Sequence, residues 1–143
     1  MNEKEQLDRI SESIIGAAIA VHRALGPGLL ESAYEACLAF ELADRGHKVE
    51  RQKELPVTYR GVTLDCGYRL DLVVDDAVVV EMKAVDTVLP IHRAQLLSYL
   101  KLSGHKLGLL INFHVRLLKD GVTRLANEMP SSAASAFSAV NSD

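Results

Sequence analysis

Apolar residues near the N-terminus recur in alternating steps of three and four, which is the spacing of one helical face. The stripe consists of Leu7, Ile10, Ile14, Ala17, Val21 and Leu25. It predicts an amphipathic helix over residues 4–25 that ends at Gly26-Pro27-Gly28, because proline cannot continue a helix. A second helix is expected from about Leu30 to Arg45, with its inward face formed by Leu30, Tyr34, Cys37, Leu38 and Leu42.

The period of the pattern then shortens to that of extended chain. Residues 48–53, 55–59 and 62–65 are short segments of this kind. Residues 68–74 and 78–83 follow, separated by the three residues Asp75-Asp76-Ala77. Both are rich in β-branched residues and apolar on both faces, so we expect them in the centre of a sheet that is covered on each side.

Helical spacing returns after these two strands. A third helix is expected over residues 91–102, followed by an apolar strand over residues 107–113. Residues 115–118 and 122–125 have the pattern of a hairpin across the turn Lys119-Asp120-Gly121. The order of elements predicts an α/β (α+β) fold in which helices flank one central mixed sheet.

The length and composition of the chain are those of a single globular domain. Its 143 residues, 48% hydrophobic and 24% charged, exclude wholesale disorder. We expect one domain over residues 1–129, with a core at 28–127 and a flexible Ser/Ala-rich tail at 130–143. Two cysteines cannot form a disulfide framework, and no signal peptide or membrane span is apparent, so a cytoplasmic location is expected.

Net charge is −3, which excludes a protein that coats nucleic acid by bulk charge. The charge is uneven, however, because residues 87–124 carry six basic residues against one acidic residue. The basic residues are Arg93, Lys101, Lys106, Arg116, Lys119 and Arg124. A solvated surface is the simpler interpretation, and a local anion-facing side is the alternative.

Three charges lie inside the two central strands. Asp71 is on the first strand, and Glu81 and Lys83 are on the second, two residues apart and therefore on one face. A tight turn at residues 75–77 makes the strands adjacent and antiparallel, which brings Asp71 and Glu81 within about a residue of register. Two buried carboxylates repel each other and lose hydration, so something must compensate them.

Two kinds of compensation fit these residues about equally well. A divalent cation could be shared by Asp71 and Glu81, with a backbone carbonyl and waters completing an oxygen shell of the kind Mg²⁺ prefers. Alternatively, Arg69 and Lys83 could neutralise the two carboxylates in a purely structural ladder without a metal. The residues alone do not decide between these alternatives.

The order of these charged residues resembles that of the PD-(D/E)xK nuclease superfamily, whose members include restriction endonucleases and Holliday-junction resolvases. Asp71 is followed ten residues later by Glu81-Met82-Lys83, and then by a helix that carries Gln95 and Tyr99. One departure is Leu70, which stands before Asp71 where the motif has proline. The resemblance implies a restriction-endonuclease-like core with the order αβββαβ.

A second motif resembles one group within this superfamily, the small prokaryotic GxxExxY proteins. Gly28, Glu31 and Tyr34 match the namesake motif position by position, and the resemblance extends over residues 10–127. From the residues alone, Gly28 is explained by turn geometry, and the Glu31 carboxylate by the positive end of a helix dipole. Tyr34 is expected in the core, on the inward face of its helix.

The resemblance implies a role for each matching residue. Asp71 and Glu81 are the implied metal ligands, with the Met82 carbonyl as a third and Glu31 as an auxiliary acid at the metal, which is Mg²⁺ or Mn²⁺. Lys83 is implied to position or polarise the attacking water. Gln95 is implied to support the site or contact the substrate backbone, whereas Tyr99 is expected to be a packed aromatic residue.

A function follows from these roles as an expectation. The chain is expected to be a metal-dependent nuclease that hydrolyses phosphodiester bonds in nucleic acid, with DNA favoured. Arg93, Lys101 and Lys106 are candidate contacts to phosphates if their helix borders the site. The alternative is a catalytically inactive binding or accessory module with the same fold, for which a homodimer is expected from the small size.

Overall fold

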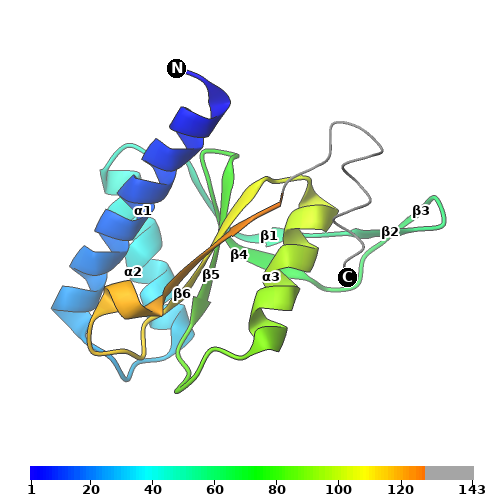
Figure 1. The fold of residues 1–143 in the computed structure, drawn as a ribbon. Helices are drawn as coiled ribbons and strands as arrows, with labels where there is room; N and C mark the ends of the chain where they lie inside the picture. The colour runs from blue at the N-terminus through cyan, green and yellow to red at the C-terminus, as the bar shows by residue number, and fades with distance from the viewer. Residues whose placement is uncertain (128–143) are drawn as a thin grey trace.

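A five-stranded mixed sheet forms the centre of the protein (Figure 1), whose computed structural model describes residues 1–127. The strand order is β1-β4-β5-β6-β7. The strands are β1 (Val49–Glu54), β4 (Arg69–Val74), β5 (Val78–Lys83), β6 (Leu107–Asn112) and β7 (Val122–Ala126). Only the β5–β6 pair is parallel within this sheet. The expected α/β fold with a central mixed sheet is therefore confirmed, and the expected tail at 130–143 lies outside the described residues.

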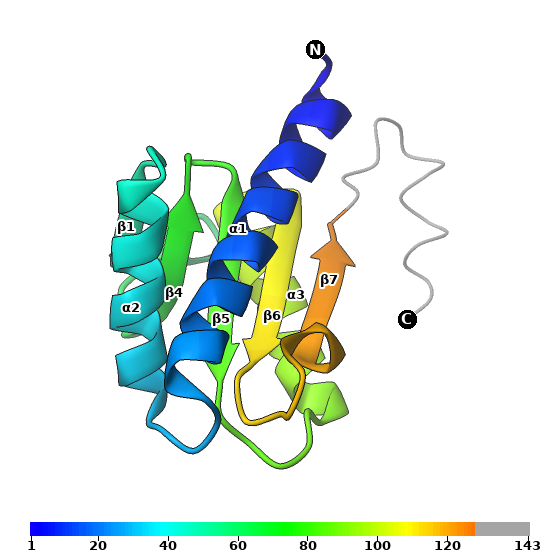
Figure 2. The same ribbon diagram turned by 90° about the vertical axis from the view of Figure 1, so that its left-hand side faces the viewer.

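Helices cover both faces of this sheet (Figure 2). α1 (Glu3–Leu25) and α2 (Glu31–Asp44) pack on one face, and α3 (Pro90–Ser103) packs on the other. Alternate residues of the central strands supply the two cores: Leu72 and Val80 face α1 and α2, whereas Val73 and Val79 face α3. Glu81 continues the row of Val79, so the strand pattern assigns it to the α3 side.

Two further strands form a small hairpin of their own. β2 (Val57–Tyr59) and β3 (Val62–Leu64) pair with each other and not with the central sheet. Almost every residue of the two strands is exposed, and the hairpin projects from the domain in Figure 1. The central mixed sheet therefore does not include these two segments, which have no buried face to contribute to it.

The hairpin expected across residues 119–121 is wrong. Residues 118–121 form a short 3₁₀ helix, η1 (Leu118–Gly121), and β7 pairs with β6 from Leu107↔Ala126 to Ile111↔Val122. Val115 and Leu118 pack instead into the core beneath α1. Val115 and Leu118 are three residues apart, which places them on one side of a helical turn and not on one face of a strand.

The turn between α1 and α2 is held by Tyr34. Its hydroxyl donates to the Gly26 carbonyl oxygen at 2.5 Å and accepts from the Leu29 N–H at 3.1 Å. Its ring stacks on Phe113 with centroids 4.4 Å apart, which confirms Tyr34 as a core residue. Leu30, expected to face inward, is 77% exposed because it precedes the helix as its N-cap.

Candidate active site

Asp71 and Glu81 face each other where the ladder between β4 and β5 stops. The paired positions run from Val74↔Val78 to Leu72↔Val80, and Asp71 and Glu81 take the next facing places. There the carboxylates replace strand carbonyls as acceptors: the Asp71 N–H donates to Glu81 Oε2 at 2.9 Å, and the Met82 N–H donates to Asp71 Oδ2 at 3.0 Å. The two acids are therefore locked together by the backbone of each other's strand.

The surroundings raise the pKa of both carboxyl groups above their ordinary values. Burial, followed by the charge of Asp71, raises the pKa of Glu81 to about 8. Burial also raises the pKa of Asp71, although hydrogen bonds from the Met82 N–H and the Gln52 amide oppose this shift. Two hard oxygen donors that resist carrying two negative charges are the kind of pair that a divalent cation would stabilise.

Lys83 lies two residues beyond Glu81 and is half-buried. Its charge lowers the pKa of Glu81, yet within residues 1–127 its ammonium makes no ion pair with a carboxylate at 4.0 Å or less. Arg69 pairs with Glu54 at 3.6 Å and not with Asp71. The structural ladder considered from the sequence, in which Arg69 and Lys83 neutralise the two acids, is therefore not formed.

Glu31 stands outside this carboxylate pair. It is exposed in the first turn of α2, and its negative charge contributes to raising the pKa of Asp71. No group of three or more His, Cys, Asp or Glu side chains in residues 1–127 is arranged to hold one metal ion. The structure thus brings Asp71 and Glu81 together. Glu31 lies close enough for its charge to act on Asp71, but it does not form a ligand cluster with the two acids.

A buried acid that sequence reasoning missed lies one helical turn after Glu31. Glu35 is only 7% exposed and accepts hydrogen bonds from Arg51 Nε at 3.2 Å and from Gln52 Nε2 at 2.7 Å. Gln52 also donates to Asp71 Oδ1 at 3.3 Å. The spacing of Glu31 and Glu35, four residues apart on one helical face, was the available signal.

Gln52 reaches both Glu35 and Asp71 because its backbone leaves the normal strand conformation. Its φ of 50° lies in the left-handed region, which L-residues seldom adopt, although β1 continues on each side of it. Gln52 stands opposite Asp71 between the pairs Arg51↔Leu72 and Lys53↔Leu70. Strained backbone of this kind is often found at functional sites, and here it aims the Gln52 amide at Glu35 and Asp71.

Replacing Gln52 by alanine is expected to weaken the site without dismantling it. The Glu35 and Asp71 carboxylates each lose a donor, so we expect metal affinity to fall roughly 10-fold and stability to fall by about 1–2 kcal/mol. Calorimetric Mn²⁺ titration and urea unfolding measure the two effects. Gln6→Ala, on the surface of α1, is the control. Unchanged Mn²⁺ affinity in Gln52→Ala would show that Gln52 has no part in orienting Asp71.

Helix α3 presents Gln95 and Tyr99 to the same region. Tyr99 is 8% exposed, and burial together with the charges of Glu81 and Asp71 raises its pKa, which places it beside the acids. Its hydroxyl accepts from Gln95 Nε2 at 3.2 Å, and its ring lies 5.7 Å from that of Tyr68. Tyr99 is therefore the packed aromatic residue that was expected. Gln95 is exposed and is connected to the acids by its hydrogen bond to Tyr99.

The three candidate phosphate contacts do not lie together. Arg93 is exposed near the start of α3. Lys106 precedes β6 at the end of the sheet remote from Glu81, and pairs with Glu3 at 2.8 Å. Lys101 lies in the last turn of α3, which precedes the start of β6 at that same remote end. The structure therefore does not bring Lys101 and Lys106 to the carboxylate pair.

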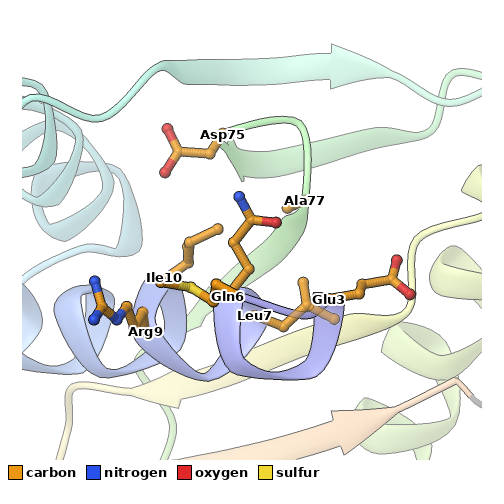
Figure 3. A pocket seen from close by; sticks show the side chains of 8 residues that line it. Glu3, Gln6, Leu7, Arg9, Ile10, Asp75 and Ala77 are labelled. Carbon is orange, nitrogen blue, oxygen red and sulfur yellow. The ribbon is translucent and has the colours of Figure 1, made fainter.

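A hollow of about 460 Å³ also lies at the remote end (Figure 3). It is bounded by the first turns of α1 and by the turn that joins β4 to β5, from which Asp75 and Ala77 contribute. Glu3 and Arg9 give its wall charges of both signs. Asp75 is already engaged there, because it accepts from the Lys48 N–H at 2.9 Å and contacts His47 Nδ1 at 2.7 Å.

Comparison with known families gives one match that spans most of the chain. The family model of the PD-(D/E)XK nuclease superfamily matches residues 8–125, a range that contains Asp71, Glu81 and Lys83. Neither curated proteins nor solved structures give a significant match. Among residues 1–127, no helix has both the length and the apolar character needed to cross a membrane. The matched range and the mixed sheet that carries its two acids establish that the chain belongs to the PD-(D/E)XK nuclease superfamily.

Proposed function

We propose that this protein is a metal-dependent nuclease that hydrolyses phosphodiester bonds in nucleic acid, with DNA favoured. The observation that carries the proposal is the carboxylate pair: the half-buried Asp71 and the buried Glu81 face each other and resist simultaneous ionisation. Within the superfamily we assign the chain to the GxxExxY group, since Gly28, Glu31 and Tyr34 match that motif.

The donor set suits Mg²⁺ or Mn²⁺. Both ions prefer oxygen ligands, and Asp71, Glu81 and the Met82 carbonyl are the groups that would hold one, with Glu31 at the margin. When bound, the ion would polarise a phosphoryl oxygen and favour ionisation of a water molecule. Its two positive charges would also offset the burial and the repulsion by Asp71 that together raise the pKa of Glu81 to about 8.

The remaining roles belong to side chains around the pair. Lys83 supplies an ammonium on the Glu81 side of β5 that makes no ion pair within the described residues, so it is available to orient the attacking water and to stabilise negative charge on the phosphate. The side-chain amide of Gln52 donates to both Glu35 and Asp71, and so holds Asp71 in place. Gln95 is exposed beside the acids and is available to a substrate.

One feature favours the second candidate, a nuclease-fold binding module without activity. Asp71 Oδ1 and Oδ2 already accept hydrogen bonds from Gln52 and Met82, and the described residues supply no third acidic ligand in the cluster. A module of this kind would bind nucleic acid through surface cations and would need no metal.

Cleavage assays separate the two functions. Single-stranded, duplex and branched DNA, together with RNA, should be incubated with the protein in Mg²⁺, in Mn²⁺ and in EDTA. The nuclease is expected to cut at least one substrate with either metal and none in EDTA. Retained binding to nucleic acid, with no cleavage in either metal and no calorimetric metal binding at millimolar concentration, would favour the inactive module.

A further inference from the structure

A second hollow, of about 370 Å³, lies between the end of α1 and the segment around η1. Its lining includes three cationic side chains, Arg23, Arg116 and Lys119, and contains no acidic residue. All three are exposed, and within residues 1–127 none makes an ion pair or a side-chain hydrogen bond. Most other Lys and Arg side chains within residues 1–127, such as Lys106 and Arg124 at the remote end of the sheet, are paired with acids.

Cations brought together in one concave site without acidic partners repel each other, and an anion relieves that repulsion. A solvated surface usually separates or pairs its charges, as Lys4 and Asp8 do on the first turns of α1. The three cations come from two segments remote in sequence, Arg23 on α1 and Arg116 and Lys119 around η1. Folding of the domain, and not a local run of basic residues, therefore concentrates the charge here.

The position of this hollow relates it to the carboxylate pair. Figures 1 and 2 both place the α1–α2 turn, the β6–η1 loop and the β5–α3 loop at one end of the molecule. Pro27 on the rim of the hollow is four residues before Glu31, so their Cα atoms are at most about 14 Å apart. One strand of duplex DNA carries a charge every 3.4 Å or so along its axis, so this separation corresponds to at most about four phosphates.

The other wall of the hollow is attached to Lys83. The Phe113 N–H donates to the Lys83 carbonyl oxygen at 2.9 Å, and Arg116 follows three residues later. Tyr34 joins the two walls, because it stacks on Phe113 and bonds to the Gly26 carbonyl. His22 Nε2 contacts the Val115 carbonyl oxygen at 2.8 Å and ties α1 to the same segment. The two segments that carry the cations are thus held at a defined place relative to the strand that carries Glu81 and Lys83.

We propose that Arg23, Arg116 and Lys119 form a phosphate-binding subsite that holds the nucleic acid backbone a few nucleotides from the Asp71–Glu81 pair. The proposal rests on the proposed function, since it extends that site toward its substrate. In this proposal the three residues, and not Lys101 and Lys106, are the principal cationic contacts to the phosphates. The subsite recognises phosphates through charge and is therefore indifferent to base sequence.

The test is the salt dependence of duplex DNA binding, measured by fluorescence anisotropy with Ca²⁺ in place of Mg²⁺. The double variant Arg116→Gln/Lys119→Gln removes two cations, and Arg23 is left in place because it also favours the C-terminal end of α1. Each phosphate contact contributes about 0.9 to the slope of log affinity against log salt. We expect the slope to fall by about 2 and the affinity at 0.1 M salt to fall roughly 50-fold.

Lys101→Gln/Lys106→Gln is the matched control, because it removes the same charge at the remote end of the sheet. Its slope and affinity are expected to stay close to those of the parent. Equal losses in the two double variants, or a loss in the control alone, would overturn the subsite. Thermal unfolding of both variants establishes that the substitutions at these exposed positions leave the fold intact.

The outcome for the subsite is separable from that for the nuclease. A parent that cuts DNA, with binding unaffected by Arg116→Gln/Lys119→Gln, contradicts the subsite and leaves the nuclease standing. A parent that binds DNA without cutting it, and loses affinity in this variant, supports the subsite and contradicts the nuclease. Absence of any binding to duplex DNA by the parent overturns the subsite directly.

Discussion

Alanine at Asp71 is expected to remove both metal binding and cleavage, whereas alanine at Lys83 is expected to remove cleavage alone. Asp71 is one of the two facing carboxylates that would hold the ion, so Asp71→Ala should lower the cleavage rate roughly 10³-fold, about 4 kcal/mol of activation free energy. Lys83 contributes charge to the reaction and no oxygen to the ion. Lys83→Ala should therefore lower the rate roughly 10²–10³-fold.

The difference between the two variants lies in their metal affinity. Titration with Mn²⁺ should give no binding to Asp71→Ala and normal or tighter binding to Lys83→Ala, because the lysine charge repels the ion. Arg69→Ala is the control, since Arg69 lies two residues from Asp71 but pairs with Glu54. Parent-like cleavage by either Asp71→Ala or Lys83→Ala would contradict the proposed assignment of the active site.

Glutamine at position 81 is expected to stabilise the metal-free protein at alkaline pH. The pKa of Glu81 is raised from its ordinary 4.5 to about 8 in the folded protein. Between these values the unfolded chain releases the proton and the folded protein retains it, so the parent loses stability as pH rises through this window and levels off above about 8. Glu81→Gln carries no such penalty, because its amide is neutral throughout.

Urea unfolding in EDTA measures this effect. At pH 4.5 the parent and Glu81→Gln should differ little, and at pH 8.5 the variant should be more stable by about 2–4 kcal/mol. The glutamine oxygen can still accept the Asp71 N–H, so the hydrogen bond at this position is retained. Glu54→Gln, an exposed acid paired with Arg69, is the control and should show no such dependence. A variant less stable than the parent at pH 8.5 would mean that the buried carboxylate is charged and compensated within the chain.

The sequence by itself was enough to place Asp71 within about a residue of Glu81. Both lie in strands of β-branched residues joined by a turn of three residues, and a turn this short allows only a narrow choice of antiparallel register. Alternation within β5 then determined that Lys83 shares the Glu81 side. Local periodicity likewise located the three helices, because each has a continuous apolar face and a glycine or proline at its boundary.

Contacts between remote segments were decided only by the tertiary structure. Gln52 links Glu35 to Asp71 because α2 packs beside β1 and because Gln52 adopts a left-handed backbone, which no local pattern indicates. The basic residues of 87–124 form one group in sequence, yet folding sends Lys106 to one end of the sheet and Arg116 to the other, beside Arg23 of α1. Spacing along a chain determines which face of an element a side chain occupies, whereas the packing of elements determines which charges become neighbours.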